Sequence, residues 1–125
     1  MVIHMNKGHK FTYIVLVSIA LLVSYLWYFF HSELYIFYEL DYQVNAMIKN
    51  HDIKKMRAVS KDKKIYTFLV HLNKNDSCQN TSDYQGGTQN IYWYGTEIKK
   101  KAIGVDMKKE NNIYWKVDKL YFTKR

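Results

Sequence analysis

The sequence predicts an α+β fold in which one N-terminal transmembrane helix continues into one or two helices packed on a four-stranded antiparallel sheet. Three observations lead to this prediction. A long uncharged run lies near the start of the chain, a segment with helical spacing follows it, and alternating apolar residues occupy the second half. The 125 residues therefore divide into a cytoplasmic tail (1–10), a transmembrane helix (11–30) and one extracytoplasmic α+β domain (31–125).

The transmembrane helix is predicted from residues 11–30, FTYIVLVSIALLVSYLWYFF, which contain no charged side chain. At about 1.5 Å per residue, a helix of this length spans a hydrocarbon core of ~30 Å. The run ends in bulky aromatic residues where a cleaved signal peptide has small ones, so it is expected to remain as an uncleaved signal anchor. Lys7 and Lys10 precede the run and Glu33 follows it. This pattern predicts a single-pass protein of the inner (cytoplasmic) membrane, with its N-terminus in the cytoplasm.

Two helices are expected before the first strand. Residues 33–48 carry apolar side chains with the spacing of one helix face, namely Phe37, Leu40, Val44, Met47 and Ile48. Polar residues of the same segment, such as Gln43, are assigned to the solvent-facing side. Asp52 is placed to cap a second, short helix over residues 53–59.

Four strands are expected after these helices. They are predicted at residues 64–73, 90–99 and 102–109 and from residue 113 onward, because each segment alternates apolar and polar residues or is rich in strand formers. The last strand has Ile113, Trp115 and Val117 on its inward face, with Trp115 and Val117 as structural core residues. The apolar parity then changes, which predicts a bulge near Asp118 and Lys119.

Residues 73–88, between the first two predicted strands, are polar and contain glycine over sixteen positions. This length is unusual for a hairpin connection and predicts a mobile loop that carries function. The candidate partner-binding residues are the aromatics and lysines of this region, expected to be exposed: Tyr84, Tyr92, Tyr94, Lys99, Lys100 and Lys101. Aromatic rings beside cations are favoured as interface anchors. The alternative interpretation is a loop beside ordinary strand tyrosines.

The sequence predicts no catalytic, cofactor-binding or metal-binding residue, and the protein is therefore expected to be non-enzymatic. Its five histidines do not show the spacing of a metal-binding motif. Cys78 is the single cysteine, which excludes an internal disulfide and a thiolate cluster. The net charge of +8 is not accompanied by a recognition helix or stacking motif, so no nucleic-acid partner is expected.

A family resemblance covers residues 44–122. It is carried by AMIKNHDIKKMRAVSKDKK, in which a helix ends before an Asp, and by VDMKKENNIYWKVDKLYF, a final hairpin that contains Trp-Lys-Val-Asp. These segments resemble the membrane-tethered NTF2-like and cystatin-like domains of bacterial envelope proteins. The chain is shorter than a full NTF2-like domain, which favours a cystatin-like or divergent relative. The resemblance implies a scaffold or accessory role.

The leading hypothesis is a non-enzymatic, membrane-anchored protein-binding or scaffold subunit of a bacterial envelope complex. One alternative is an immunity or exclusion protein that neutralises an incoming toxin at the inner membrane. Another is a small-molecule or lipid-binding NTF2-like domain. The expected partners are accordingly the membrane, through one transmembrane helix, and another envelope protein or a toxin. A second copy of the chain, forming a homo-oligomer, is also considered.

Overall fold

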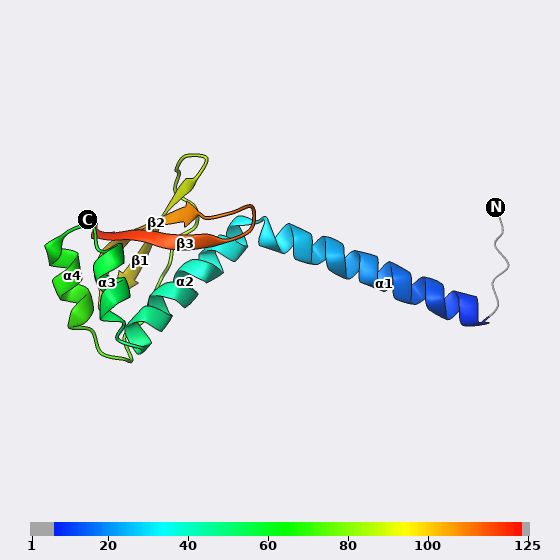
Figure 1. Cartoon of the computed structure of the whole chain (residues 1–125), viewed down its shortest axis with the longest axis horizontal. Helices are drawn as coiled ribbons and strands as arrows, with labels where there is room; N and C mark the ends of the chain where they lie inside the picture. The colour runs from blue at the N-terminus through cyan, green and yellow to red at the C-terminus, as the bar shows by residue number, and fades with distance from the viewer. Residues whose placement is uncertain (1–6, 124–125) are drawn as a thin grey trace. The chain divides into compact units, whose positions relative to one another are not determined.

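The computed structural model describes residues 7–123 and has an α+β architecture (Figure 1). In chain order, the elements within this range are α1 (Lys7–Phe30), α2 (Glu33–Lys49), α3 (Ile53–Val59), α4 (Lys63–Val70), β1 (Ile91–Ile98), β2 (Lys101–Lys109) and β3 (Trp115–Phe122). The chain divides into two compact units, the first containing α1 and the second beginning at Glu33. The second unit contains every other helix and the sheet.

α1 confirms the predicted long apolar helix near the N-terminus. Its 24 residues are long and apolar enough to cross a membrane, and none of their side chains is buried by other parts of the protein. The hydroxyl groups of Thr12 and Ser18 donate hydrogen bonds to backbone carbonyl groups one turn earlier, at 2.9 and 2.8 Å. These side chains therefore satisfy their own polar groups within the helix, as an apolar environment requires.

α2 confirms the first helix of the domain and shifts its buried face slightly. The residues that face the core are Ile36, Leu40, Val44, Met47 and Ile48. Phe37, predicted to be one of them, is only half-buried. The prediction that Gln43 faces solvent is wrong, because its side chain is buried. The Gln43 amide donates to the carbonyl oxygen of Trp115 at 2.9 Å and accepts from the backbone N–H of Val117 at 2.8 Å. These bonds give partners to backbone groups on the edge of β3 that does not pair with β2.

α3 forms as predicted, with the Asp52 side chain accepting a hydrogen bond from the backbone N–H of Lys55. The first predicted strand, however, is a helix. The Asp62 carboxylate caps the start of α4 by accepting from the backbone N–H of Ile65 at 3.0 Å. Ile65 and Leu69, one helical turn apart, are completely buried. The cap and this spacing prevail over the strand propensity of the segment.

The sheet has three antiparallel strands in the order β1-β2-β3. The buried apolar side chains of its central strand are Ile103, Val105 and Met107, as the alternation predicts. The register changes so that Asp106 pairs with Lys119 and Met107 pairs with Val117, which confirms the predicted bulge at Asp118. Trp115 and Val117 are buried as expected. Ile113 was expected to face inward, but it lies exposed in the turn before β3.

Residues 73–88, here called the edge segment, run along the free edge of β1. Backbone hydrogen bonds join Gln79 to Glu97, Ser82 to Gly95 and Gln85 to Trp93 at 2.7 to 2.9 Å. The pairing is irregular, with isolated bridges between Gln79 and Glu97 and between Gly87 and Tyr92, and the edge segment does not form a continuous fourth strand. The edge segment is thus tied to the sheet, in contrast to the mobile loop that its composition predicts. It also covers a sheet edge that would otherwise offer unpaired backbone groups.

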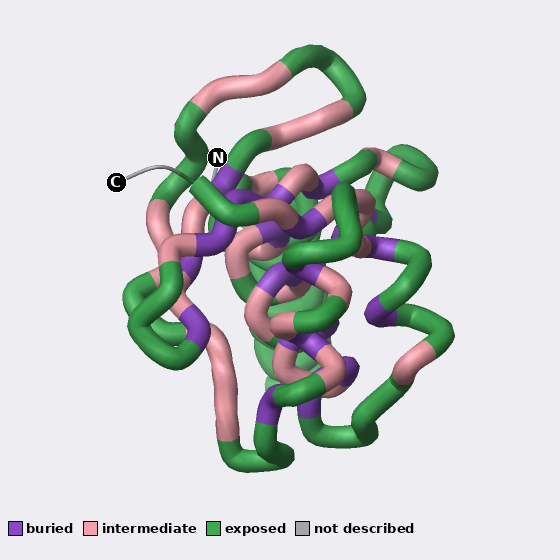
Figure 2. The backbone as a smooth tube through the Cα atoms, turned by 90° about the vertical axis from the view of Figure 1, so that its left-hand side faces the viewer, coloured by how far each residue is buried: buried purple, intermediate pink, exposed green. Residues whose placement is uncertain are grey.

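The core lies between the sheet and the three helices of the domain, which pack against β3 (Figure 1). Buried positions gather where these elements meet, and the connecting turns are exposed (Figure 2). On the opposite face of the sheet, the ring of Tyr121 lies directly over Gly104, where a Cβ atom would collide with it. The Tyr121 hydroxyl donates to Asp106 at 3.0 Å. Trp93 on this face is 45% exposed. The helices therefore cover one face of the sheet, whereas the opposite face is partly exposed to solvent.

Candidate functional site

The six predicted partner-binding residues lie in two groups at different places along β1. Tyr92 and Tyr94 lie near the start of this strand, and Tyr84 of the edge segment packs beside them. The lysines lie in the hairpin after its end. At about 3.3 Å per residue, the two groups are separated by roughly 20 Å along the strand. The predicted aromatic rings and lysines therefore lie apart along β1, and their joint role in partner binding stays a prediction.

The lysine group forms the tight connection between β1 and β2. Lys99 and Lys100 adopt left-handed backbone conformations with φ of 51° and 65°, and Lys101 begins β2. This is the conformation of a two-residue hairpin turn that usually contains Asn-Gly. All three side chains are exposed. The geometry explains how the turn is made, and it gives these lysines no converging arrangement around a ligand.

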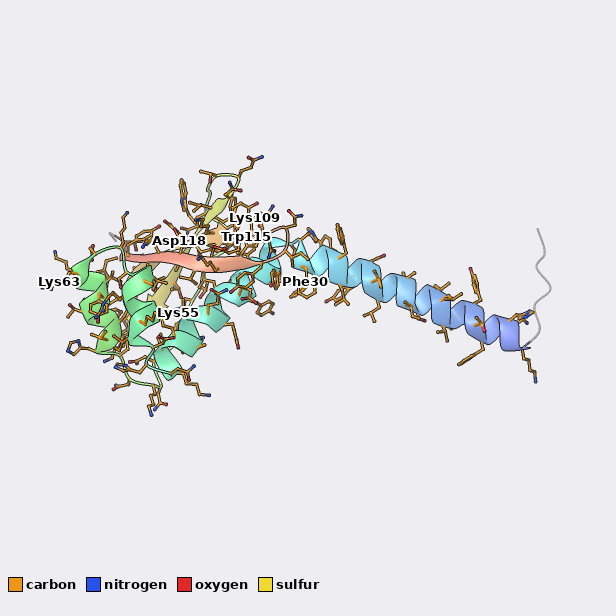
Figure 3. The ribbon with its side chains drawn as sticks, viewed as in Figure 1. Phe30, Lys55, Lys63, Lys109, Trp115 and Asp118 are labelled. Carbon is orange, nitrogen blue, oxygen red and sulfur yellow. The ribbon has the colours of Figure 1, made fainter. Side chains whose placement is uncertain are left out.

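The aromatic group is a connected cluster that rests on Trp115. Tyr84 lies edge-to-face with Tyr92 and Tyr94, at ring-centroid distances of 4.6 and 6.4 Å. Tyr92 packs on Trp115 at 4.4 Å. Trp115 itself stands at the start of β3, beside its paired residue Lys109 (Figure 3). Tyr84 is 37% exposed, but Tyr92 is half-buried and Tyr94 is buried, so the prediction of three exposed tyrosines is correct only for Tyr84.

A half-open pocket of about 210 Å³ lies against this cluster. Its lining comes from α2, the edge segment and β1, and consists of Glu33, Leu34, Phe37, Asp83, Tyr84 and Tyr94. The pocket thus combines two carboxylates with aromatic and aliphatic side chains, and we call it the acidic-aromatic pocket. The charged side chains that line the pocket with these tyrosines are acidic, whereas the sequence predicts lysines there.

Tyr94 contributes an unusual polar group to the acidic-aromatic pocket. Its side chain is 2% exposed, and its hydroxyl group forms no hydrogen bond with any residue that the structure describes. Burial is the main cause that raises the pKa of Tyr94 above the ordinary value, and the charge of Glu33 adds to the shift. The phenol therefore remains neutral at physiological pH. It presents an oxygen with unused hydrogen-bonding capacity.

A second polar group, here called the paired cluster, joins α2 to the edge segment further along the helix. It consists of Asp41, Asn45, Cys78, Thr81 and Thr96. The Thr81 hydroxyl donates to Asp41 at 2.7 Å and lies 2.9 Å from the Thr96 hydroxyl. The Asn45 side chain accepts from the backbone N–H of Cys78 at 2.8 Å. Each of these contacts ties the edge segment to its neighbours, which identifies the paired cluster as structural.

Burial raises the pKa of the Cys78 thiol to about 12, although a hydrogen bond with Thr96 opposes the shift. A thiol with this pKa is protonated at neutral pH and is a poor nucleophile. Burial also raises the pKa of Asp41, against the effect of its hydrogen bond with Thr81. In the range 7–123, no group of three His, Cys, Asp or Glu side chains is arranged to hold a metal ion.

Sequence reasoning found the tyrosines and missed the acids. Glu33 and Asp83 are fifty positions apart, and only the packing of the edge segment on α2 brings them to one pocket. No protein-family model, curated protein or solved structure matches the chain. The resemblance to NTF2-like and cystatin-like domains therefore stays a prediction.

Proposed function

We propose that this chain is a non-enzymatic, membrane-anchored protein-binding subunit of a bacterial envelope complex. The observation that supports this function best is the acidic-aromatic pocket with exposed Tyr84 in its lining. Tyrosine is enriched at protein interfaces because it buries a large area at a small cost in conformational entropy. α1 supplies an apolar helix suited to anchoring such a domain at a membrane.

Two properties of the acidic-aromatic pocket favour a protein partner over a free ligand. Its volume of about 210 Å³ is smaller than the ~300–1,000 Å³ of typical small-molecule sites and is suited to one protruding side chain. The edge segment that carries Asp83 and Tyr84 is fixed by backbone hydrogen bonds to β1. A surface held in this way loses little conformational entropy on binding, which favours affinity.

The experiment that tests this function is site-specific photocrosslinking in native membranes. A photoreactive phenylalanine analogue at Tyr84 should capture a discrete envelope protein. The matched control is the same analogue at Trp93, which is similarly exposed, at 45% against 37%, but lies on the opposite face of the sheet. Equal capture from both positions, or capture from Trp93 alone, would contradict recognition at the acidic-aromatic pocket.

Mass spectrometry of the captured protein separates the related hypotheses. A component of an envelope complex supports the scaffold role, and an incoming toxin supports an immunity or exclusion role. A second copy of this chain would indicate a homo-oligomer.

The proposed location is the inner membrane, with residues 1–10 in the cytoplasm and the domain outside it. Lys7 and Lys10 on the N-terminal side of α1 support this orientation through the positive-inside rule. Alkaline phosphatase fused after Arg125 should be active, and a fluorescent protein that folds only in the cytoplasm should be dark at the same position. The reverse pair of results would contradict the orientation.

A further inference from the structure

The two carboxylates of the acidic-aromatic pocket have no cationic partner in the part of the chain that the structure describes. Neither Glu33 nor Asp83 forms an ion pair or a side-chain hydrogen bond there. Both side chains are exposed, although the protein has 19 Lys and Arg residues and a net charge of +8. Glu33 lies in the first turn of α2. The pocket therefore has negative charge that the protein does not neutralise internally.

The buried hydroxyl group of Tyr94 is an independent observation that points to a missing donor. Buried polar atoms in folded proteins nearly always have a hydrogen-bond partner. In this pocket the Tyr94 oxygen has none, while the oxygen of the comparable Tyr121 is bonded to Asp106. A ligand with N–H donors would supply the partner that Tyr94 lacks.

We infer that the acidic-aromatic pocket binds a primary ammonium group, and that this group is a lysine side chain of the protein partner. The pocket has two exposed carboxylates, from Glu33 and Asp83, and Tyr94 in its lining brings a buried hydroxyl oxygen as a third acceptor, so that the three match the three N–H donors of an ammonium group. The rings of Phe37 and Tyr84 provide surface for the aliphatic stem and cation–π attraction for the charge. This inference rests on the proposed function, because it takes the pocket as the recognition site.

Other cationic groups fit the pocket less well. Arginine carries five donors in a planar fork, which calls for a wider arrangement of acceptors. A phosphatidylethanolamine headgroup also has an ammonium group, but its phosphate would be brought beside two carboxylates that repel it. A lysine side chain brings a single positive charge on an apolar stem, as this pocket requires.

The first test uses n-butylammonium as the probe and the full chain in uncharged maltoside micelles. Ring signals of ¹³C-labelled tyrosines should shift saturably for Tyr84 and Tyr94. n-Butanol, which has the same stem without the charge, should produce no saturable shift. Saturation by n-butanol with equal affinity, or no saturation by n-butylammonium, would overturn the inference.

Substitution of the carboxylates identifies the site. Glu33→Gln and Asp83→Asn should each weaken n-butylammonium binding about tenfold or more, because a charged hydrogen-bond partner is lost. Asp118→Asn changes the net charge equally on β3, which does not line the pocket, and should bind like the parent chain. Parent-like binding by both pocket variants would overturn the assignment. Circular dichroism confirms that each variant is folded.

A second titration distinguishes the sources of the ammonium group. A short peptide with one lysine should bind, and the same peptide with acetyl-lysine should not. Competition by short-chain phosphatidylethanolamine at equal strength would assign the pocket to lipid and overturn the lysine assignment. Amine binding without crosslinking from Tyr84 would leave this site in place and refute the proposed function. Crosslinking from Tyr84 without amine binding would support the proposed function and overturn the ammonium site.

Discussion

The edge segment contacts α2 in two places, and these places differ in whether their polar groups are hydrogen-bonded to each other. At the paired cluster, Thr81 bonds to Asp41 and approaches Thr96, and Asn45 satisfies the backbone of Cys78. At the acidic-aromatic pocket, two exposed carboxylates and one buried hydroxyl group, that of Tyr94, lack such partners. Both places join the same two elements. The difference therefore arises from local side-chain chemistry and does not reflect a general looseness of the segment.

This difference indicates a division of roles along one contact. Polar groups that satisfy each other rigidify a structure, whereas unsatisfied buried groups destabilise it and are retained where a ligand completes them. The paired cluster fixes the edge segment on the domain, and the fixed segment then holds Asp83 and Tyr84 against α2. Substitutions in the two places should consequently separate stability from binding.

The largest effect is expected from Trp115→Ala, which should disturb the aromatic cluster beside the acidic-aromatic pocket. The ring is 6% exposed and supports Tyr92, and through it the rest of the aromatic cluster. Truncation of a buried tryptophan should lower the free energy of unfolding by ~3 to 5 kcal/mol. Urea unfolding of the full chain in maltoside micelles, followed by circular dichroism, measures this loss. Trp93→Ala, at an exposed position, is the matched control and should cost much less. Equal losses would refute the inward placement of Trp115.

A smaller loss is expected from Gln43→Met, which keeps the length of the side chain and removes its amide. The backbone carbonyl of Trp115 and N–H of Val117 would then lose their partners, and the free energy of unfolding should fall by about 2 to 3 kcal/mol. Gln89→Met in an exposed turn controls for the change of residue type. An unchanged urea midpoint for Gln43→Met would mean that water satisfies the edge of β3 equally well.

The elements that the sequence predicts correctly are those with a strong local pattern. The uncharged run of α1, the apolar stripe of α2, the Asp52 cap and the parity change at Asp118 are each visible in a short window. α4 was missed because aromatic and β-branched residues in this helix imitate an alternating strand, and its distinguishing feature is the Asp62 cap. The edge segment pairs irregularly with β1, so its sequence has no strand periodicity from which this pairing could be predicted.

The candidate site was predicted only in part, for two physical reasons. Both faces of β1 carry aromatic residues, so its alternation cannot show that Tyr94 faces the helices and that Trp93 does not. The pocket also depends on contacts between residues far apart in sequence, Glu33 and Asp83. Gln43 illustrates a related limit, because polarity suggests solvent while an unpaired strand edge recruits its amide into the core.

Asp41→Asn tests the paired cluster through its pH dependence. Burial holds the pKa of Asp41 above its ordinary value, so the folded chain keeps a proton that the unfolded chain has released. This carboxyl group therefore makes stability fall as pH rises through the window above an ordinary aspartate pKa of about 3.9. Asn can still accept the hydrogen bond from Thr81 but does not ionise. The stability of the variant relative to the parent should consequently increase between about pH 3 and pH 7.

Urea unfolding at a series of pH values measures this difference. Asp118→Asn, outside the paired cluster, controls for the loss of one negative charge. A difference between Asp41→Asn and the parent that stays constant with pH would show that burial of Asp41 does not govern its protonation.

The smallest change in stability is expected from Tyr94→Phe, and its sign distinguishes the two places most directly. Because the Tyr94 hydroxyl is buried without a partner, its removal should leave the free energy of unfolding unchanged or raise it by up to about 1 kcal/mol. Tyr121→Phe is the matched control, since its hydroxyl donates to Asp106 at 3.0 Å and its loss should lower stability by about 1 kcal/mol. At the same time, Tyr94→Phe should weaken n-butylammonium binding, whereas Tyr121→Phe should not. A destabilised Tyr94→Phe variant would mean that this hydroxyl group has a structural partner, and its pocket would then resemble the paired cluster.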